Sequence, residues 1–280
     1  MTDQPVEEPV KGDRIAKVIA RAGICSRRDA ERLIADGKVA VNGIVLETPA
    51  TLVTADDEIT IDGAPVRRAV LTRLWRYHKP AGLITSHRDP QGRPTVFDNL
   101  PKNMPRVISV GRLDLNSEGL LLLTNDGALA RRLEHPENSW ERRYRVRVYG
   151  RPDPTELANL AKGVSVDGVD YGPIDASLSK APASTKADGR MKDSERRGAN
   201  SWLSVTLREG KNREIRKVMA HIGLRTNRLI RTDYGPFTLG SVEPGAVAEI
   251  PADELFEKLA IGAKPKPRPK QNSRHAHRRR

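Results

Sequence analysis

A loop aspartate between two apolar stretches is the residue best placed for chemistry in this sequence. Asp114 follows the apolar stretch 107–110 and precedes the leucine run 120–123. Buried strands on both sides would hold its carboxylate with little positional freedom, as a nucleophile requires. Aspartates in loops also commonly accept hydrogen bonds from nearby backbone amides. Spacing alone therefore leaves a catalytic role and a structural role open.

The charge of the chain favours a polyanionic partner. Of its 280 residues, 49 are Lys or Arg and 36 are Asp or Glu, which gives a formal charge of +13. A chain this basic can bind nucleic acid or an acidic membrane surface. Asp114 and Glu118 could form the carboxylate pair of a glycoside hydrolase, but a neutral sugar substrate would not explain this charge.

The distribution of apolar residues and cysteine narrows the class of protein further. No apolar stretch approaches the ~18 residues that a membrane span needs. The first ten residues lack the basic and apolar regions of a signal peptide, so we expect a cytoplasmic protein. The single cysteine, Cys25, excludes disulfides within the chain and clusters of thiolate metal ligands.

The first part of the chain has the pattern of a small domain. Residues 12–66 contain a helical stretch that ends at Gly23 and a second helix capped by Ser26, and two short strands follow. Residues 1–11 are acidic and unpatterned, which predicts a disordered lead-in. Residues 67–73 show little periodicity and form the expected linker.

The larger part of the chain, residues 74–260, mixes strands and helices without regular alternation. This arrangement predicts an α+β domain with a mostly antiparallel mixed sheet. We expect a strand at residues 83–86 and a helix capped by Asn212. Residues 179–200 are polar and predict a flexible insertion, and residues 261–280 predict a disordered basic tail.

Four stretches carry a resemblance to a known family. Residues 111–127, GRLDLNSEGLLLLTNDG, resemble the catalytic motif of pseudouridine synthases. Residues 77–86, 142–148 and 207–223 are similar to three further motifs of the family, in the same order. The family contains the ribosomal small-subunit enzyme A and the large-subunit enzymes B, E and F, and this chain looks most like enzyme B.

The resemblance implies roles for the residues that match these motifs. Asp114 corresponds to the nucleophile, and Arg216 corresponds to the arginine that pairs with it. Tyr144 corresponds to the tyrosine that stacks on the extruded base or serves in proton transfer. Two further residues are expected to contact the flipped nucleotide and its phosphates, namely Arg112 and Asn116.

Two other matches bear on the structure of the site. Lys79 and Pro80 match a fixed turn of the family, so we expect a structural role for them. Many relatives in the wider superfamily carry His-Gln where this chain has Arg213 and Glu214. The resemblance therefore assigns no role to these two positions.

The N-terminal part resembles the S-four RNA-binding domain. Basic residues on its two helices are expected to line a phosphate-binding face, to which the helix ends add favourable dipoles. These residues are Arg14, Lys17, Arg21, Arg27 and Arg28. Ordinary solvated side chains are the alternative interpretation.

The resemblance implies an enzyme that converts uridine to pseudouridine in ribosomal RNA. The expected target is large-subunit RNA, and small-subunit RNA is the alternative. The isomerisation requires neither a metal nor a cofactor, so we expect none. The expected partner is ribosomal RNA, free or in a pre-ribosomal particle, and the protein is expected to be a monomer. A noncatalytic RNA-binding or ribosome-assembly factor is the alternative function.

Overall fold

The computed structural model describes residues 12–67, 71–180 and 200–261 of the chain. The predicted lead-in, most of the predicted insertion at 179–200 and nearly all of the predicted basic tail lie outside these residues. Within the described residues, no helix combines the length and the apolar character needed to cross a bilayer.

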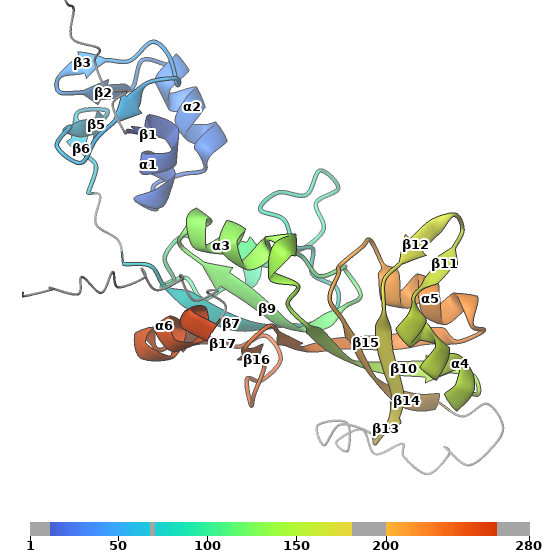
Figure 1. Ribbon diagram of the computed structural model, residues 1–280. Helices are drawn as coiled ribbons and strands as arrows, with labels where there is room; N and C mark the ends of the chain where they lie inside the picture. The colour runs from blue at the N-terminus through green and yellow to red at the C-terminus, as the bar shows by residue number, and fades with distance from the viewer. Residues whose placement is uncertain (1–11, 68–70, 181–199, 262–280) are drawn as a thin grey trace, which may run out of the picture.

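The N-terminal domain consists of two helices packed on short strands (Figure 1). Ser26 caps the second helix as predicted, because its hydroxyl accepts the Asp29 N–H at 3.0 Å. Ile15, Ile19 and Ile34 form the centre of its own small core. The elements are β1 (Asp13–Arg14), α1 (Ile15–Arg21), α2 (Arg27–Ala35), β2 (Val39–Val41), β3 (Ile44–Val45), β4 (Leu52–Val53), β5 (Ile59–Ile61) and β6 (Ala64–Pro65).

The second domain, which carries the candidate active site, is built on one large sheet. Its main path runs β13-β14-β10-β15-β9-β7-β17, with β16 beside β15 and β8 beside β9. Strands β15 and β9 pair in parallel, whereas the other pairings of this sheet in the described residues are antiparallel. The predicted mostly antiparallel mixed sheet is therefore confirmed.

The bounds of its strands are β7 (Leu74–Lys79), β8 (Ile108–Val110), β9 (Glu118–Thr124), β10 (Arg142–Tyr149), β13 (Ile174–Ser179), β14 (Asn200–Leu207), β15 (Arg225–Tyr234), β16 (Phe237–Thr238) and β17 (Val247–Ile250). A separate hairpin pairs β11 (Val164–Val166) with β12 (Val169–Tyr171). The helices are α3 (Gly127–Glu134), α4 (Pro154–Asn159), α5 (Glu214–His221) and α6 (Ala252–Ile261).

The leucine run of β9 lies at the centre of this domain. Leu121 and Leu123 point into a core that also contains residues of α4 and α5. Leu120 and Leu122 point to the opposite face, into a core shared with α3 and α6. A strand that is buried on both faces needs continuous apolar residues, which explains why this run does not alternate with polar side chains.

The prediction of a strand at residues 83–86 is wrong. The segment makes an isolated bridge between Ile84 and Thr95. The hydroxyl of Thr85 donates to the carbonyl of Leu113 at 2.9 Å, so the segment supports the loop that carries Asp114. Leu83 and Thr85 are both buried, and this alternate burial gives the same sequence pattern as a strand.

Candidate active site

Asp114 lies in a loop between β8 and β9, as the sequence predicts. The backbone of this loop is held from several sides. The N–H of Ser117 donates to the carbonyl of Asp114 at 3.0 Å, and the N–H of Gly82 donates to that of Leu115 at 2.8 Å. Because the loop is fixed at both ends and in its middle, the side chain of Asp114 has a defined direction.

Lys79 is the internal anchor of this loop. It is fully buried, and its Nζ lies within hydrogen-bond distance of four backbone carbonyls. Three of these belong to the loop: Asp114 at 3.1 Å, Leu115 at 3.3 Å and Ser117 at 2.8 Å. Burial lowers the pKa of Lys79 to about 8, against the opposing charges of Glu118 and Asp114. The contacts support the structural role expected for this residue.

The backbone of β9 at Gly119 lies in close contact with the backbone of β15 at Arg231. Gly119 has a φ of +98°, and a Cβ atom there would lie 2.2 Å from the carbonyl oxygen of Arg231. Glycine alone fits this position, because any side chain would meet the backbone of β15. The parallel pairing of β9 with β15 thus brings the Asp114 loop beside the segment that precedes α5.

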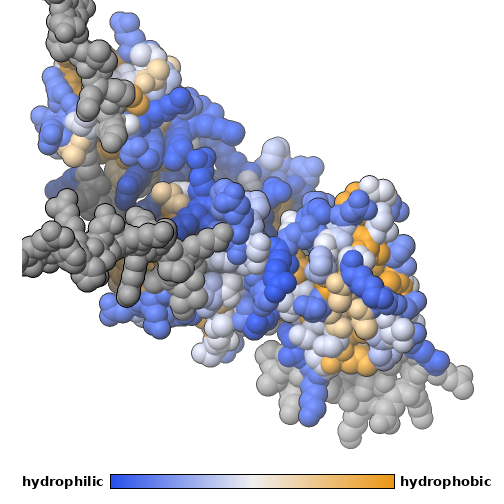
Figure 2. Space-filling model, in the orientation of Figure 1, coloured by the Kyte–Doolittle hydropathy of each residue, from blue (hydrophilic) through white to orange (hydrophobic). Residues whose placement is uncertain are grey.

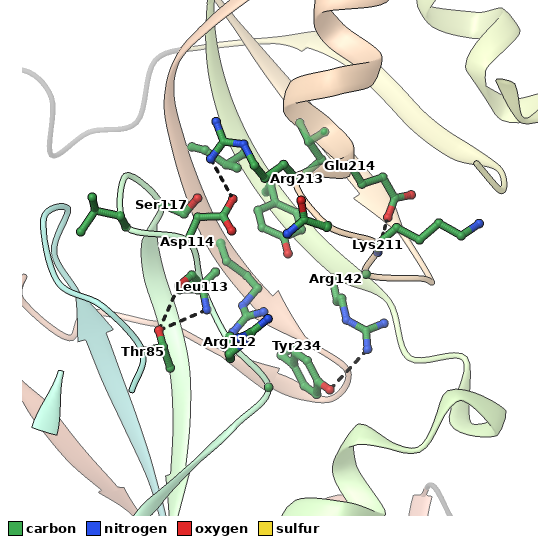
Figure 3. A pocket seen from close by; sticks show the side chains of 18 of the residues that line it. Thr85, Arg112, Leu113, Asp114, Ser117, Arg142, Lys211, Arg213, Glu214 and Tyr234 are labelled. Atoms are coloured by element: carbon green, nitrogen blue, oxygen red, sulfur yellow. Dashed lines mark hydrogen bonds and ion pairs between the residues drawn. The ribbon is translucent and has the colours of Figure 1, made fainter. Parts of the chain in front are cut away.

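Asp114 lines a cavity of about 650 Å³ (Figure 3). This volume is in the range of small-molecule and nucleotide sites. The walls come from the Asp114 loop, from β10 and β15, and from the loop before α5. Among the lining residues are Arg112, Tyr144, Arg213, Leu229 and Arg231.

The ion pair of Asp114 differs from the one predicted. Arg213, not Arg216, is its partner, with Nη1 of Arg213 3.7 Å from Oδ2 of Asp114. Arg216 instead donates to the carbonyls of Asn116 at 2.8 Å and Thr226 at 3.3 Å. Arg216 lies within the helix, where these carbonyls bind its guanidinium, whereas Arg213 precedes the helix and its side chain reaches the carboxylate.

Arg216 remains an electrostatic neighbour of the nucleophile candidate. Burial lowers the pKa of Arg216, and the charge of Arg213 lowers it further, while the charge of Asp114 raises it. Its Nε is buried without a hydrogen-bond partner among the described residues. By bonding to the Asn116 carbonyl, Arg216 holds the Asp114 loop against α5.

The other predicted contacts divide into two groups. Tyr144, on β10, is 9% exposed and lines the cavity together with Asp114. Arg112 is exposed and also lines the cavity. Asn116 is exposed, and its backbone carbonyl serves Arg216, but it is not among the lining residues.

Sequence reasoning missed a second group of basic residues in the cavity wall. Arg231 is 3% exposed, and its Nε donates to the carbonyl of Leu120 at 2.8 Å. The guanidinium carbons of Arg142 and Arg231 lie 4.9 and 5.1 Å from the ring centre of Tyr234. Arg142 lies in the motif at 142–148 but received no role of its own, and no motif marked Arg231 or Tyr234.

The start of α5 also departs from the prediction. Asn212 does not cap the helix, which begins at Glu214 after Arg213 in the left-handed conformation, with φ of 52°. The carboxyl group of Glu214, the first residue of the helix, instead accepts the N–H of Lys211 in the preceding turn at 2.9 Å. The positive φ at a non-glycine residue has no signature in the sequence.

Most of the basic residues predicted on the N-terminal domain face the second domain. Four of them line two hollows together with arginines of that domain, among them Arg88 and Arg106. These four are Lys17, Arg21, Arg27 and Arg28. Arg14 is exposed but lines neither hollow, and Arg21 forms an ion pair with Asp126 at 3.4 Å.

Comparison with known families agrees with this division of the chain. The profile described as RNA pseudouridylate synthase matches residues 73–221. The profile of the S4 domain, written S-four above, matches residues 13–59. The two profiles fall on the two folded parts of the structure.

Relatives extend the similarity over most of the chain. A protein of Rickettsia felis, named an uncharacterized RNA pseudouridine synthase, is 49% identical over 88% of this chain and 99% of its own. Proteins of Pasteurella multocida and Shigella flexneri, each named ribosomal large subunit pseudouridine synthase B, are both 42% identical. They match 82% and 81% of this chain, and 64% and 75% of their own lengths, respectively.

A solved structure shares the fold. It is described as a crystal structure of pseudouridylate synthase, and it aligns with a TM-score of 0.59 at 22% identity over 88% of this chain and 99% of its own. The family profile and the relatives cover most of the sequence, including the cavity and its loop. This chain therefore belongs to the RNA pseudouridylate synthase family.

Proposed function

We propose that this enzyme isomerises specific uridines of ribosomal RNA, with large-subunit RNA as its target. The observation that carries the proposal is the placement of Asp114, on a fixed loop in a nucleotide-sized cavity beside Arg213 and Tyr144. The two relatives named for the large ribosomal subunit support the choice of RNA.

The reaction sets clear demands on the site. The bond between C1′ of the ribose and N1 of the base breaks, a bond from C1′ to C5 forms, the hydrogen on C5 leaves as a proton, and N1 takes up a proton. The uridine must leave the stack to enter the cavity, which costs a few kcal/mol of unstacking. Asp114 is the proposed nucleophile, and Nη1 of Arg213 lies 3.7 Å from its Oδ2.

Tyr144 and Arg112 are proposed to hold the extruded nucleotide. The ring of Tyr144 is largely buried in the cavity wall and can stack on a flat base. Arg112 is exposed at the cavity and can bind a phosphate of the RNA backbone. Asn116, which lies next to the cavity, is proposed to contact the same nucleotide from outside.

Mapping pseudouridines in ribosomal RNA tests the proposal directly. RNA from cells that lack this protein should lose pseudouridine at one or more uridines of the large subunit, and the purified enzyme should restore them. Loss at small-subunit positions instead would move the target to the other RNA. An unchanged set of pseudouridines in both RNAs would contradict the proposal.

Truncating Tyr144 should slow the reaction and identify its role. Tyr144→Ala removes the ring, so we expect a loss of single-turnover rate of about 5- to 150-fold, as stacking is worth about 1–3 kcal/mol per base. Tyr144→Phe keeps the ring, so a near-normal rate would assign stacking. A loss of about 10²–10⁴-fold would assign proton transfer by the hydroxyl.

The control for Tyr144 is Tyr149→Ala, at the end of the same strand. Tyr149 is exposed and packs against Arg225, away from the cavity. This variant should keep the wild-type rate. A normal rate for Tyr144→Ala would exclude both proposed roles.

The basic face of the S-four domain is proposed to bind phosphates of the RNA. Replacing both Arg27 and Arg28 with alanine should raise the KM for a long rRNA fragment and leave kcat unchanged, because phosphate contacts position the RNA without touching the base. The slope of log affinity against log salt should become shallower by about 1–2. Arg151→Ala, in the loop after β10, should change neither quantity, and an unchanged salt slope in the double variant would contradict this role.

A further inference from the structure

A buried glutamate fixes the loop that carries the arginine partner of Asp114. Glu214 is 4% exposed, and its Oε2 accepts the backbone N–H of Lys211 at 2.9 Å. The backbone N–H of Glu214 donates in turn to the carbonyl of Lys211 at 3.3 Å. These reciprocal bonds close a tight turn around Arg213 (Figure 3).

The second oxygen of Glu214 has an unusual neighbour. Oε1 is buried, and no N–H or O–H group reaches it among the described residues. The carboxyl group of Glu214 instead lies close enough to that of Glu209 for the charge of Glu209 to raise its pKa. Two carboxylates in contact repel each other when both are ionised, whereas one proton between them makes a hydrogen bond.

The contacts of Glu209 favour its ionised form, so Glu214 is the member of the pair that holds the proton. Glu209 accepts the N–H of Gly172 at 2.6 Å and forms an ion pair with Lys211 at 2.8 Å. Burial acts to raise the pKa of Glu209, but these two contacts outweigh it and the pKa is lowered. Burial and the charge of Glu209 raise the pKa of Glu214 to about 7, although the bond from Lys211 N–H opposes them.

Other charged groups around the pair have partners of their own. Lys211 bonds the carbonyl of Asp170 on β12, and its Nζ lies 5.6 Å from the ring centre of Tyr171. Arg142 passes beside Gly210 but donates to the carbonyls of Trp140 and Arg208. The charge of Asp170 acts on Lys211, and that of Arg213 lies against Asp114. None of these contacts supplies a donor to Oε1 of Glu214.

We propose that Glu209 and Glu214 share one proton and together clamp the turn that holds Arg213 against Asp114. Arg213 has a φ of 52°, a conformation that a non-glycine residue keeps only where its surroundings impose it. When the proton is lost, the two carboxylates repel, the turn relaxes and Arg213 moves away from the nucleophile. The inference rests on the proposed function, because it concerns the ion pair of Asp114. Glu209 and Glu214 are positioning residues and do not touch the uridine.

The test compares single-turnover rates at pH 6.0 and pH 7.5. Between pH 6.0 and pH 7.5 the wild-type rate should fall about fourfold relative to the rate of Glu214→Gln. The reason is that a group with pKa 7 is almost fully protonated at pH 6.0 but only about one quarter protonated at pH 7.5. A glutamine keeps the acceptor for Lys211 N–H and gives Glu209 a donor that cannot titrate. Its rate at pH 6.0 should be within about threefold of wild type.

Two further variants make the comparison specific. Glu209→Gln removes the like charge beside Glu214, so its rate should also lose this pH dependence. Glu141→Gln alters a half-buried carboxylate that pairs with Arg143 and Arg208, and it should keep the wild-type profile. A wild-type to Glu214→Gln ratio that is equal at the two pH values would overturn the proposal.

Unfolding measurements separate this inference from the proposed function. A folded-state pKa raised from 4.5 to about 7 favours the folded protein fully below pH 4.5, and this benefit is lost as pH rises to 7. The Tm of wild type should therefore fall relative to that of Glu214→Gln between pH 5 and pH 7.5. If the enzyme does not isomerise ribosomal RNA, the proposed function fails while this shift still reports the shared proton. A constant difference in Tm would rule out the clamp.

Discussion

Replacing Asp114 with asparagine is expected to abolish pseudouridine formation, with a rate at least about 10³-fold below wild type. The amide keeps the shape of the side chain but is a very poor nucleophile. Affinity for the RNA should stay within a few-fold, because the fixed loop and the basic surface are unchanged. Single-turnover assays and RNA binding, measured on the same preparations, give the two numbers.

The matched control is Asp167→Asn, in the turn between β11 and β12. Asp167 is exposed and has a φ of 51°, which asparagine adopts as readily as aspartate. This variant should turn over like wild type. A rate for Asp114→Asn that is clearly above this limit of about 10³-fold below wild type would remove Asp114 from the role of nucleophile.

Replacing Lys79 with methionine is expected to reduce both stability and turnover. Methionine has a similar length, but it leaves the carbonyls of Asp114, Leu115 and Ser117 without the buried ammonium group. Uncompensated buried polar groups cost about 1–3 kcal/mol each, so we expect unfolding to become easier by about 3 kcal/mol or more. A loop displaced by roughly 1 Å can cost about 10²-fold in rate.

Chemical denaturation and single-turnover assays measure these two effects. Lys102→Met is the control, since Lys102 is exposed in a loop away from the cavity. It should match wild type in both assays. If Lys79→Met is as stable and as active as wild type, the four carbonyls do not depend on this ammonium group.

The surface in Figure 2 is hydrophilic over most of the face shown, including that of the S-four domain. The hollows lined by Arg27, Arg28, Arg88 and Arg106 lie where the two domains meet. The proposed positioning of the RNA and the proposed chemistry on the uridine therefore belong to different parts of the molecule.

Local patterns in the sequence predicted the elements of the fold well. The cap at Ser26, the strand with the leucine run and the loop position of Asp114 each depend on neighbours within a few residues. The segment 83–86 failed because its alternate burial arises from packing against a loop, and the sequence pattern is the same as that of a strand.

Contacts between residues that are distant in the sequence could not be predicted from these local patterns. Nothing near Arg213 indicates its left-handed backbone, so the arginine that matches the family motif, Arg216, was expected to pair with Asp114 directly. The close contact of Gly119 with Arg231 likewise depends on the assembled sheet. Such contacts are determined by tertiary packing, which leaves no periodic signal in the chain.

The parallel pairing of β9 and β15 also determines when the enzyme becomes active during its synthesis. It joins residues about a hundred positions apart, and Arg228 and Glu118, which bond across it, are 110 residues apart in the sequence. Closing so long a loop costs entropy that local hairpins do not have to overcome. The S-four domain is complete once residue 66 has left the ribosome, whereas the site requires β15 near residue 230. A growing chain therefore completes its S-four domain long before the strand that lies beside the Asp114 loop has been synthesised.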